Sequence, residues 1–285
     1  MLRDEHRDAD LRHGDDEGAR DDPPNSTHGV TLAAREAATN ADDWRGACYH
    51  DLMTARSLKR ALETLADREK AAFFPRFFKT CKGQYGEGDV FVGVTVPQIR
   101  TVVRQHRGMP LSEIEKLLRD EIHECRLAAV LLLVERFERG DESTKKGTVD
   151  FYLSHLDCVN NWDLVDSSAA KILGAHLKSR DRTVLETLAS SGDLWKERVS
   201  VVATYAFIRE GEYAPTLHLA KKFLRHRHDL IHKAVGWMLR EVGKKDAKSL
   251  KDFLDEFAAS MPRTMLRYAI EKFDASERAR YLRKK

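Results

Sequence analysis

The chain has 285 residues, and 49 Lys and Arg side chains against 46 Asp and Glu leave a net charge of +3 at pH 7. This length allows one large domain or two ordinary ones with a sizeable core, and no apolar run approaches the roughly 18 residues that a membrane span requires. The acidic N-terminus has no apolar h-region and fits neither a secretory signal nor a typical mitochondrial presequence, so we expect an intracellular, soluble protein of the cytoplasm, or of the nucleus in a eukaryote.

The small net charge is the sum of two unequal parts. Residues 1–45 hold 12 acidic and 6 basic side chains, a net charge of −6, whereas the remaining residues hold 34 and 43, a net charge of +9. The first part is polar, has no aromatic residue before Trp44 and offers too little apolar surface to fold, so we predict an acidic disordered tail over residues 1–45. Residues 46–285 form the predicted folded domain, whose positive charge is compatible with a nucleic-acid partner.

Helical periodicity begins after the tail. Leu58, Leu62 and Leu65 fall at i, i+4 and i+7, which places them on one face of a helix. Comparable apolar stripes follow at residues 114–118, 127–137, 172–177, 201–208, 217–224, 231–239, 250–257 and 265–273. The stripe at residues 127–137 is apolar almost throughout, which predicts a nearly buried helix.

Turn-forming residues mark the expected helix boundaries. Gly or Pro interrupts the pattern at residues 108–110, 139–141, 191–193, 210–212 and 261–262. Ser112 and Glu115 form the S-x-x-E pattern of a capping box. The segment VFVGVTV (90–96) alternates as a strand does but has no partner strand, so we expect an extended linker and then a helix that begins at Pro97.

A helix pair about every 40 residues is typical of an α-solenoid. We therefore predict an all-α fold, an α-α superhelix of the HEAT or armadillo-like kind with about six helix pairs over residues 46–285. A globular helical bundle is the alternative, because the repeat period is loose. In a solenoid, the functional residues are expected on the concave face.

Three tryptophans lie in clusters that mix polar and aromatic residues, namely NNWDLVD (160–166), LWKER (194–198) and HKAVGWMLR (232–240). Asn160 or Asn161 suits the N-cap of a helix in which Trp162 and Asp166 share a face at i and i+4. Taken one by one, such residues are more often structural than functional, and Trp195 is interpreted as structural.

The sequence offers no metal or disulfide motif. The four cysteines stand far apart without a CxxC pair, so we expect free thiols. His226, His228 and His232 have a spacing that only superficially suggests ligands, and they are interpreted as basic surface residues. We expect no metal and no cofactor.

Five segments together resemble the AlkD-like DNA glycosylases, the HEAT-repeat family of DNA alkylation repair enzymes. They are FVGVTVPQIR (91–100), HECRLAAVLLL (123–133), NNWDLVD (160–166), WKERVSVVATY (195–205) and HKAVGWMLRE (232–241), and they occur in the family's order. The pair NNWDLVD and GWMLRE is the more specific part of the match. The resemblance implies a curved helical solenoid that holds duplex DNA in a basic concave groove and excises cationic N3- and N7-alkylated purines.

The resemblance also implies the roles of individual residues. Asp166 matches the family's catalytic carboxylate, and Trp162 and Trp237 match the aromatic residues that flank the lesion-bearing nucleotide. Arg198 matches the arginine that contacts the DNA backbone beside the lesion. The alkylated base is already a cationic leaving group, so an ionised carboxylate that stabilises the oxocarbenium-like sugar and orients water is sufficient for the chemistry.

The expected protein is a monomeric, monofunctional DNA glycosylase of base excision repair whose partner is duplex DNA containing alkylated purines, with no membrane partner. Basic residues that we expect along the groove are Lys221, Lys222, Arg225, Arg227, Lys233, Arg240 and Lys244, with Lys145, Lys146 and Lys245 as further candidates. For most of them a solvated helix face is an equally good interpretation. The alternative functions are a non-catalytic HEAT module that binds damaged or branched DNA and a protein-interaction scaffold.

Overall fold

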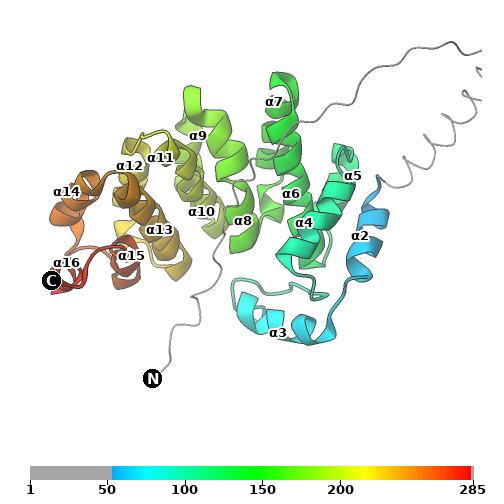
Figure 1. The fold of residues 1–285 in the computed structure, drawn as a ribbon, viewed down its shortest axis with the longest axis horizontal. Coiled ribbons are helices and arrows are strands. Elements are labelled where there is room, and N and C mark those ends of the chain that lie inside the picture. Colours follow the sequence, from blue (N-terminus) through cyan, green and yellow to red (C-terminus); the bar gives the residue numbers. More distant parts are fainter. Residues whose placement is uncertain (1–52, 284–285) are drawn as a thin grey trace, which may run out of the picture. The chain divides into compact units, whose positions relative to one another are not determined.

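The computed structural model of the chain describes residues 53–283 (Figure 1). In these residues an isolated bridge between Val90 and Ile122 is the only extended pairing, and the regular elements are helices. The α-helices are α2 (Ala55–Glu63), α3 (Arg68–Phe78), α4 (Val96–Gln105), α5 (Leu111–Leu118), α6 (His123–Arg139), α7 (Glu142–Ser154), α8 (Trp162–Ser168), α9 (Thr183–Ala189), α10 (Leu194–Ala203), α11 (Tyr205–Arg209), α12 (Ala214–Lys222), α13 (Asp229–Lys245), α14 (Ala247–Phe257), α15 (Arg263–Ala269) and α16 (Ala275–Arg283). A π-helix at Ala170–Gly174 follows α8, and short 3₁₀-helices lie at Leu156–Cys158, Leu177–Ser179 and Phe223–Arg225.

Two rows of helices pack against each other in this part of the chain. In the first row α4, α6, α8, α10, α13 and α15 each contact the next helix named, and in the second row α5, α7, α9, α11, α12 and α14 each contact a helix of the first row. Helix pairs therefore stack in chain order, which the colours of Figure 1 follow from α2 to α16. This arrangement is an α-α superhelix and confirms the predicted fold class.

The apolar core includes almost the whole of α6. Every side chain of α6 from His123 to Val134 is buried, which confirms the nearly buried helix that the apolar stripe predicts. The first turn of α6 differs from the rest, because it buries the polar side chains of His123, Glu124 and Arg126. Buried charges require partners, and these three find theirs in the segment between α3 and α4 and in α8.

Most of the predicted boundaries agree with the structure. All five Gly- or Pro-containing breaks lie between helices, and Gly108, Gly192 and Gly211 have positive φ angles. Pro97 lies in the first turn of α4 after a segment without regular structure, and Asn161 is the N-cap of α8.

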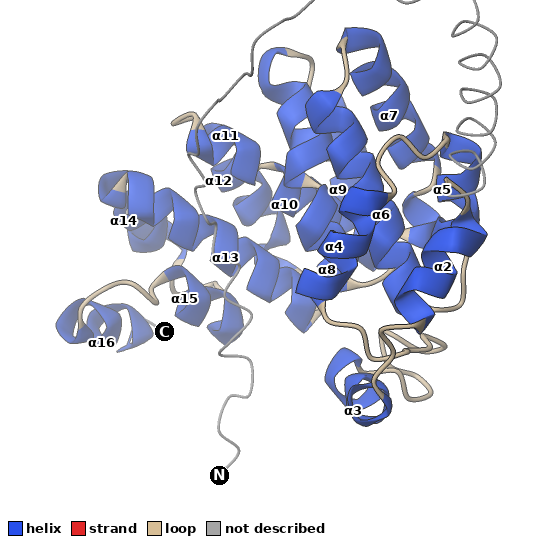
Figure 2. Ribbon diagram, turned by 45° about the vertical axis from the view of Figure 1, so that its right-hand side comes forward, coloured by secondary structure: helices blue, strands red, loops and turns tan. Residues whose placement is uncertain are grey.

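Several features of the structure differ from the sequence analysis. Leu65, predicted to share a helical face with Leu58 and Leu62, lies beyond the end of α2 and is 37% exposed. The capping box at Ser112 is wrong, because α5 begins at Leu111 with Pro110 as its N-cap, and the fixed φ of proline already prepares the start of a helix. Helix α3 has no counterpart among the predicted stripes, because its phenylalanines are paired around Pro75 and cover more than one face. Figure 2 shows α3 set apart from the packed rows and joined to them by loops.

None of the helices within residues 53–283 is long and apolar enough to cross a membrane. The predicted acidic tail, residues 1–45, lies outside the described residues.

Close packing of α13 on α15 generates a stability prediction. A Cβ atom on Gly236 would lie 2.5 Å from the Met265 carbonyl oxygen and 2.5 Å from Tyr268 Cβ. We expect Gly236→Ala to lower the free energy of unfolding by about 1–3 kcal/mol, because the helices have to move apart. Gly147 in α7 is exposed with open space around it, so Gly147→Ala should raise stability by about 0.5–1 kcal/mol. Chemical denaturation measures the free energy of unfolding of both variants. An equal change in the two variants would contradict the close packing of α13 on α15.

Candidate active site

A buried ion pair between Asp166 and Arg198 forms the centre of the candidate site. Arg198 Nε donates to Asp166 Oδ1 at 2.9 Å, and Nη2 donates to Oδ2 at 2.8 Å, which is the bidentate geometry of the strongest arginine–carboxylate pairs. The two side chains are 6% and 13% exposed. The structure thus brings two predicted site residues, 32 positions apart in the sequence, into direct contact.

Arg198 also joins a third helix to this pair. Its Nη1 donates to the carbonyl oxygen of Leu230, in the first turn of α13, at 2.6 Å. Since Asp166 belongs to α8 and Arg198 to α10, one guanidinium connects three successive helices of the first row. Three of its five N–H groups are used in this way, and two remain for a further acceptor.

Asp166 experiences opposing influences on its charge. Burial raises the pKa of Asp166 above its ordinary value of 3.8, and the nearby carboxylate of Asp163 acts in the same direction. The charge and hydrogen bonds of Arg198 act against this rise. The pair therefore allows an ionised carboxylate to persist in a largely desolvated position, where its electrostatic effect on a neighbouring cation is stronger than in water.

Trp162 lies one helical turn before Asp166 and is supported by aromatic side chains. Its ring stacks on Phe78 at the end of α3, with centroids 5.3 Å apart and planes inclined by 11°, and Phe77 meets it edge-on at 5.8 Å. The Asn161 side chain accepts a hydrogen bond from the Trp162 backbone N–H at 2.8 Å. These contacts hold an incompletely buried indole beside the ion pair, on the helical face that the sequence predicts for Trp162 and Asp166.

Tyr85 is a site residue to which the sequence analysis assigns no role. Burial raises the pKa of Tyr85, against the effects of its hydrogen bond with Trp162 and of the nearby charge of Arg198. Its ring meets Trp195 edge-on, with centroids 6.0 Å apart, so Trp195 supports the site as a packing residue. Tyr85 lies between α3 and α4, where no periodicity marks it, and the glycines around it are the only local signal.

Trp237 stands further along α13. It follows Leu230 by seven residues, which is two helical turns on the same face and about 10 Å along the axis. Its ring is half-buried and lies against Tyr205, with centroids 6.2 Å apart. The structure therefore places Trp237 on the same face of α13 as Leu230. The Trp237 ring does not contact the Trp162 ring directly.

The three histidines before and within α13 organise its start. His226 donates from Nε2 to Glu197 Oε2 at 2.9 Å and accepts the His228 backbone N–H at its Nδ1. His228 caps α13 by accepting the Leu230 N–H, and His232 donates to the His226 carbonyl oxygen at 2.6 Å. At least one ring nitrogen of each histidine thus bonds to the protein itself, and these bonds fix the turn that presents the Leu230 carbonyl to Arg198.

The basic residues expected along the groove differ in their partners within the chain. Four of them have acidic partners within the chain: Lys222 with Glu186, Lys233 with Asp229, Arg240 with Glu241 and Glu271, and Lys244 with Glu241. Lys221 lies over the ring of Phe257. Arg225 and Arg227 are exposed, and among residues 53–283 neither forms an ion pair. They precede Leu230 by five and three positions.

A double-mutant cycle tests the buried pair. Arg198→Gln leaves the Asp166 carboxylate buried without its counter-charge, so we expect it to lower the free energy of unfolding by roughly 3–5 kcal/mol at pH 7. In the Asp166→Asn background the same substitution should cost less, with a coupling energy of about 0.5–3 kcal/mol. The exposed pair Lys146–Asp150 is the control, with a coupling below about 1 kcal/mol. Strictly additive effects at Asp166 and Arg198 would rule out the pairing.

Comparison with known proteins identifies the family. The family of DNA alkylation repair enzymes matches residues 58–273, which is most of the chain. A predicted DNA alkylation repair enzyme from Enterococcus faecalis is similar in structure, with a TM-score of 0.59 and 16% identity over 74% of this chain and 97% of the other; at this identity the likeness shows the fold alone. A search of curated proteins finds no match. This chain belongs to the family of DNA alkylation repair enzymes.

Proposed function

We propose that this protein is a monofunctional DNA glycosylase that hydrolyses the N-glycosidic bond of cationic N3- and N7-alkylated purines in duplex DNA. Membership of the DNA alkylation repair family supports the reaction class and the DNA substrate. The observation that carries the finer proposal is the carboxylate of Asp166, held by two hydrogen bonds from Arg198 beside Trp162. No general acid, metal or cofactor is required, because the alkylated purine leaves as a neutral base.

Asp166 is the proposed catalytic residue. As the bond between C1′ and the base breaks, positive charge develops on the sugar, and a fixed carboxylate stabilises that charge and orients the attacking water. Arg198 keeps the carboxylate in place, so little reorganisation is needed when the charge develops. Arg198 is also proposed to approach a phosphate with its two remaining N–H groups.

Trp162 and Trp237 are the proposed contacts of the lesion-bearing nucleotide. The face of an indole attracts cations by about 0.5–2 kcal/mol, depending on desolvation. Trp162 is half-buried and covered on one side by Phe78, which leaves the ring in a fixed orientation. Trp237 is half-buried on α13, so the two rings project from helices on either side of α10.

Substitution of the carboxylate tests the proposed reaction. We expect Asp166→Asn to lower the single-turnover rate of 7-methylguanine release from methylated duplex DNA by about 10²–10³-fold, because the neutral amide cannot stabilise the cationic sugar. In the wild-type protein the rate should fall as the pH falls through the raised pKa of Asp166.

The matched control is Asp150→Asn, the same change at an exposed carboxylate on α7, which should leave the rate unchanged. Two results would contradict the proposal: release by the wild-type protein that does not exceed the uncatalysed background, or an Asp166→Asn variant as fast as the wild type. Tight binding of damaged duplex without release would favour a non-catalytic DNA-binding module.

Arg225 and Arg227 are proposed as phosphate contacts of the groove. They are exposed, lack an acidic partner in the described residues and lie in the turn that leads to Leu230. Lys222 and Lys244 carry the same charge, but each is paired with a glutamate. An unpaired cation neutralises a phosphate without first giving up an intramolecular partner.

The salt dependence of DNA binding distinguishes the two groups. Each phosphate contact contributes about 0.9 to the slope of log K against log salt concentration for duplex DNA. Arg225→Gln/Arg227→Gln should therefore reduce the slope by about 2, and Lys222→Gln/Lys244→Gln should reduce it less. Fluorescence anisotropy with an undamaged duplex measures both, and a larger effect of the lysine pair would overturn the assignment.

A further inference from the structure

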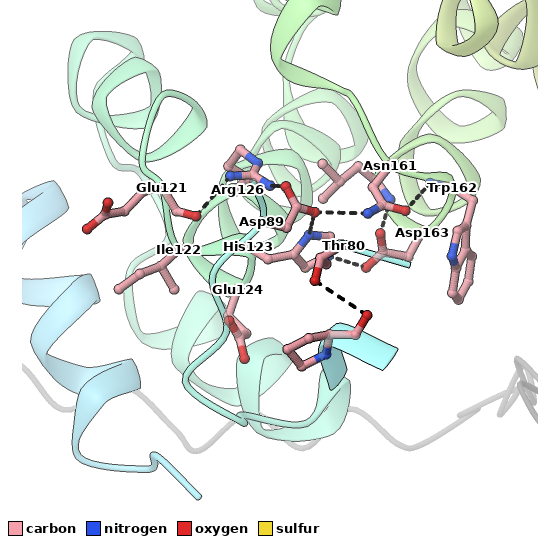
Figure 3. A network of polar contacts seen from close by, with 12 residues as sticks. Thr80, Asp89, Glu121, Ile122, His123, Glu124, Arg126, Asn161, Trp162 and Asp163 are labelled. Carbon is pink, nitrogen blue, oxygen red and sulfur yellow. Dashed lines mark hydrogen bonds and ion pairs between the residues drawn. The ribbon is translucent and has the colours of Figure 1, made fainter. Parts of the chain in front are cut away.

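A histidine at the start of α6 is enclosed between two carboxylates. His123 Nδ1 lies 2.9 Å from Asp89 Oδ2, and Nε2 lies 2.8 Å from Asp163 Oδ2. His123 is 1% exposed, so water does not serve either ring nitrogen. Figure 3 shows the imidazole between the segment that carries Asp89 and the first turn of α8.

This geometry defines the charge of the ring. An ionised carboxylate only accepts hydrogen bonds, so each of the two contacts requires an N–H, and a neutral imidazole has only one. The ring also stacks on Phe91, with centroids 4.7 Å apart, and lies 4.9 Å from Phe78, and aromatic faces attract cations. Burial alone lowers the pKa of His123, but Asp163 and Asp89 outweigh it and raise that pKa to about 9.

The charged histidine fastens the segment that carries Tyr85. Asp89 lies four residues after Tyr85 and also accepts hydrogen bonds from Arg126 and from the Asn161 side chain. Glu124 accepts the backbone N–H groups of Val92, Gly93 and Val94, at 2.8 Å for the closest. The path of the segment between α3 and α4 is therefore determined by the first turn of α6.

The same group of residues also holds Trp162 in position. Asn161, which donates to Asp89, accepts the Trp162 backbone N–H, and Asp163 follows Trp162 directly. Phe78 lies between the imidazole and the indole, in ring contact with both. Loss of the positive charge on His123 would leave one of the two carboxylates facing a ring nitrogen that no longer carries a proton.

We propose that the imidazolium of His123, held between Asp89 and Asp163, is a positioning group that sets Trp162 and Tyr85 in place for the reaction. The inference rests on the proposed glycosylase function for its readout. The partners of His123 are Asp89, Asp163, Phe78 and Phe91 rather than Asp166, so it acts through the two aromatic side chains.

A pH dependence follows from this role. The ionisable groups around His123 are Asp89 between α3 and α4, Asp163 on α8, and Glu124 and Arg126 on its own helix. A raised pKa in the folded state means that the stabilisation is complete below the ordinary value of 6.5 and is lost as the pH rises through about 9. Excision should therefore decline on the alkaline side around pH 9.

Two carboxylate variants test the positioning role. Asp89→Asn and Asp163→Asn each remove one partner of the imidazolium, so we expect the alkaline decline of the single-turnover rate to move about one pH unit lower in both. The rate also falls on the acidic side, as Asp166 becomes protonated. Only Asp163→Asn should move this fall to lower pH, because Asp163 contributes to the raised pKa of Asp166. Asp150→Asn is the control and should move neither. If both variants lose thermal stability but their single-turnover rates decline at the same alkaline pH as that of the wild type, the network is merely structural and the proposal is overturned.

A measurement without DNA separates this inference from the proposed function. In ¹⁵N spectra of the full chain, the chemical shift of the Trp162 indole should change with pH together with that of the His123 ring, with a midpoint near pH 9. In Asp89→Asn this midpoint should move to lower pH. If the wild type releases no alkylpurine but this titration is seen, the glycosylase proposal fails and the coupling of His123 to Trp162 stands. A His123 ring that is neutral at pH 7.5, or a Trp162 signal that does not respond to it, would refute the positioning role.

Discussion

The guanidinium of Arg198 joins α8, α10 and α13 through Asp166 and the Leu230 carbonyl. Both partners of the ion pair are almost completely removed from water, so neither tolerates the loss of the other. Helices of one row pack at distances of about 8–10 Å, and the long arginine side chain spans this gap. The same contact that fixes the spacing of three helices also keeps a carboxylate oriented and ionised in a desolvated position. Stability and the proposed chemistry thus depend on one interaction.

A second set of buried charges adjoins Phe78, which stacks on Trp162. His123, Asp89 and Asp163 satisfy one another with hydrogen bonds, and Phe78 transmits their arrangement to the indole by direct stacking. This arrangement resists displacement, because a movement of any of the three side chains would leave a buried group unsatisfied. The side chains proposed to face the nucleotide are therefore supported by charged residues that take no part in the chemical step. Precise positioning requires such a supporting layer.

Helices were predictable from the sequence wherever burial affects one face, as with Leu58 and Leu62 of α2. The pairing of Trp162 with Asp166 followed from local spacing, whereas the contact of Asp166 with Arg198 spans 32 positions and has no local signal. His123 and Asp89 are of residue types that are usually solvated, so nothing in the sequence separates them from surface residues. Tyr85 lies in an irregular segment whose path is set by Glu124. The capping box at Ser112 failed because Pro110 is the N-cap of that helix instead.

The central claim is that the Asp166 carboxylate stabilises positive charge on the sugar. The affinity for a duplex with a cationic pyrrolidine nucleotide, compared with a neutral tetrahydrofuran nucleotide at the same position, measures this directly, since a group complementary to the transition state prefers its charged mimic. The wild-type protein should bind the cationic duplex at least about tenfold more tightly, which corresponds to about 1.4 kcal/mol, and Asp166→Asn should lose the preference. Equal affinity of the wild type for both duplexes, or an undiminished preference in Asp166→Asn, would contradict the role assigned to this carboxylate.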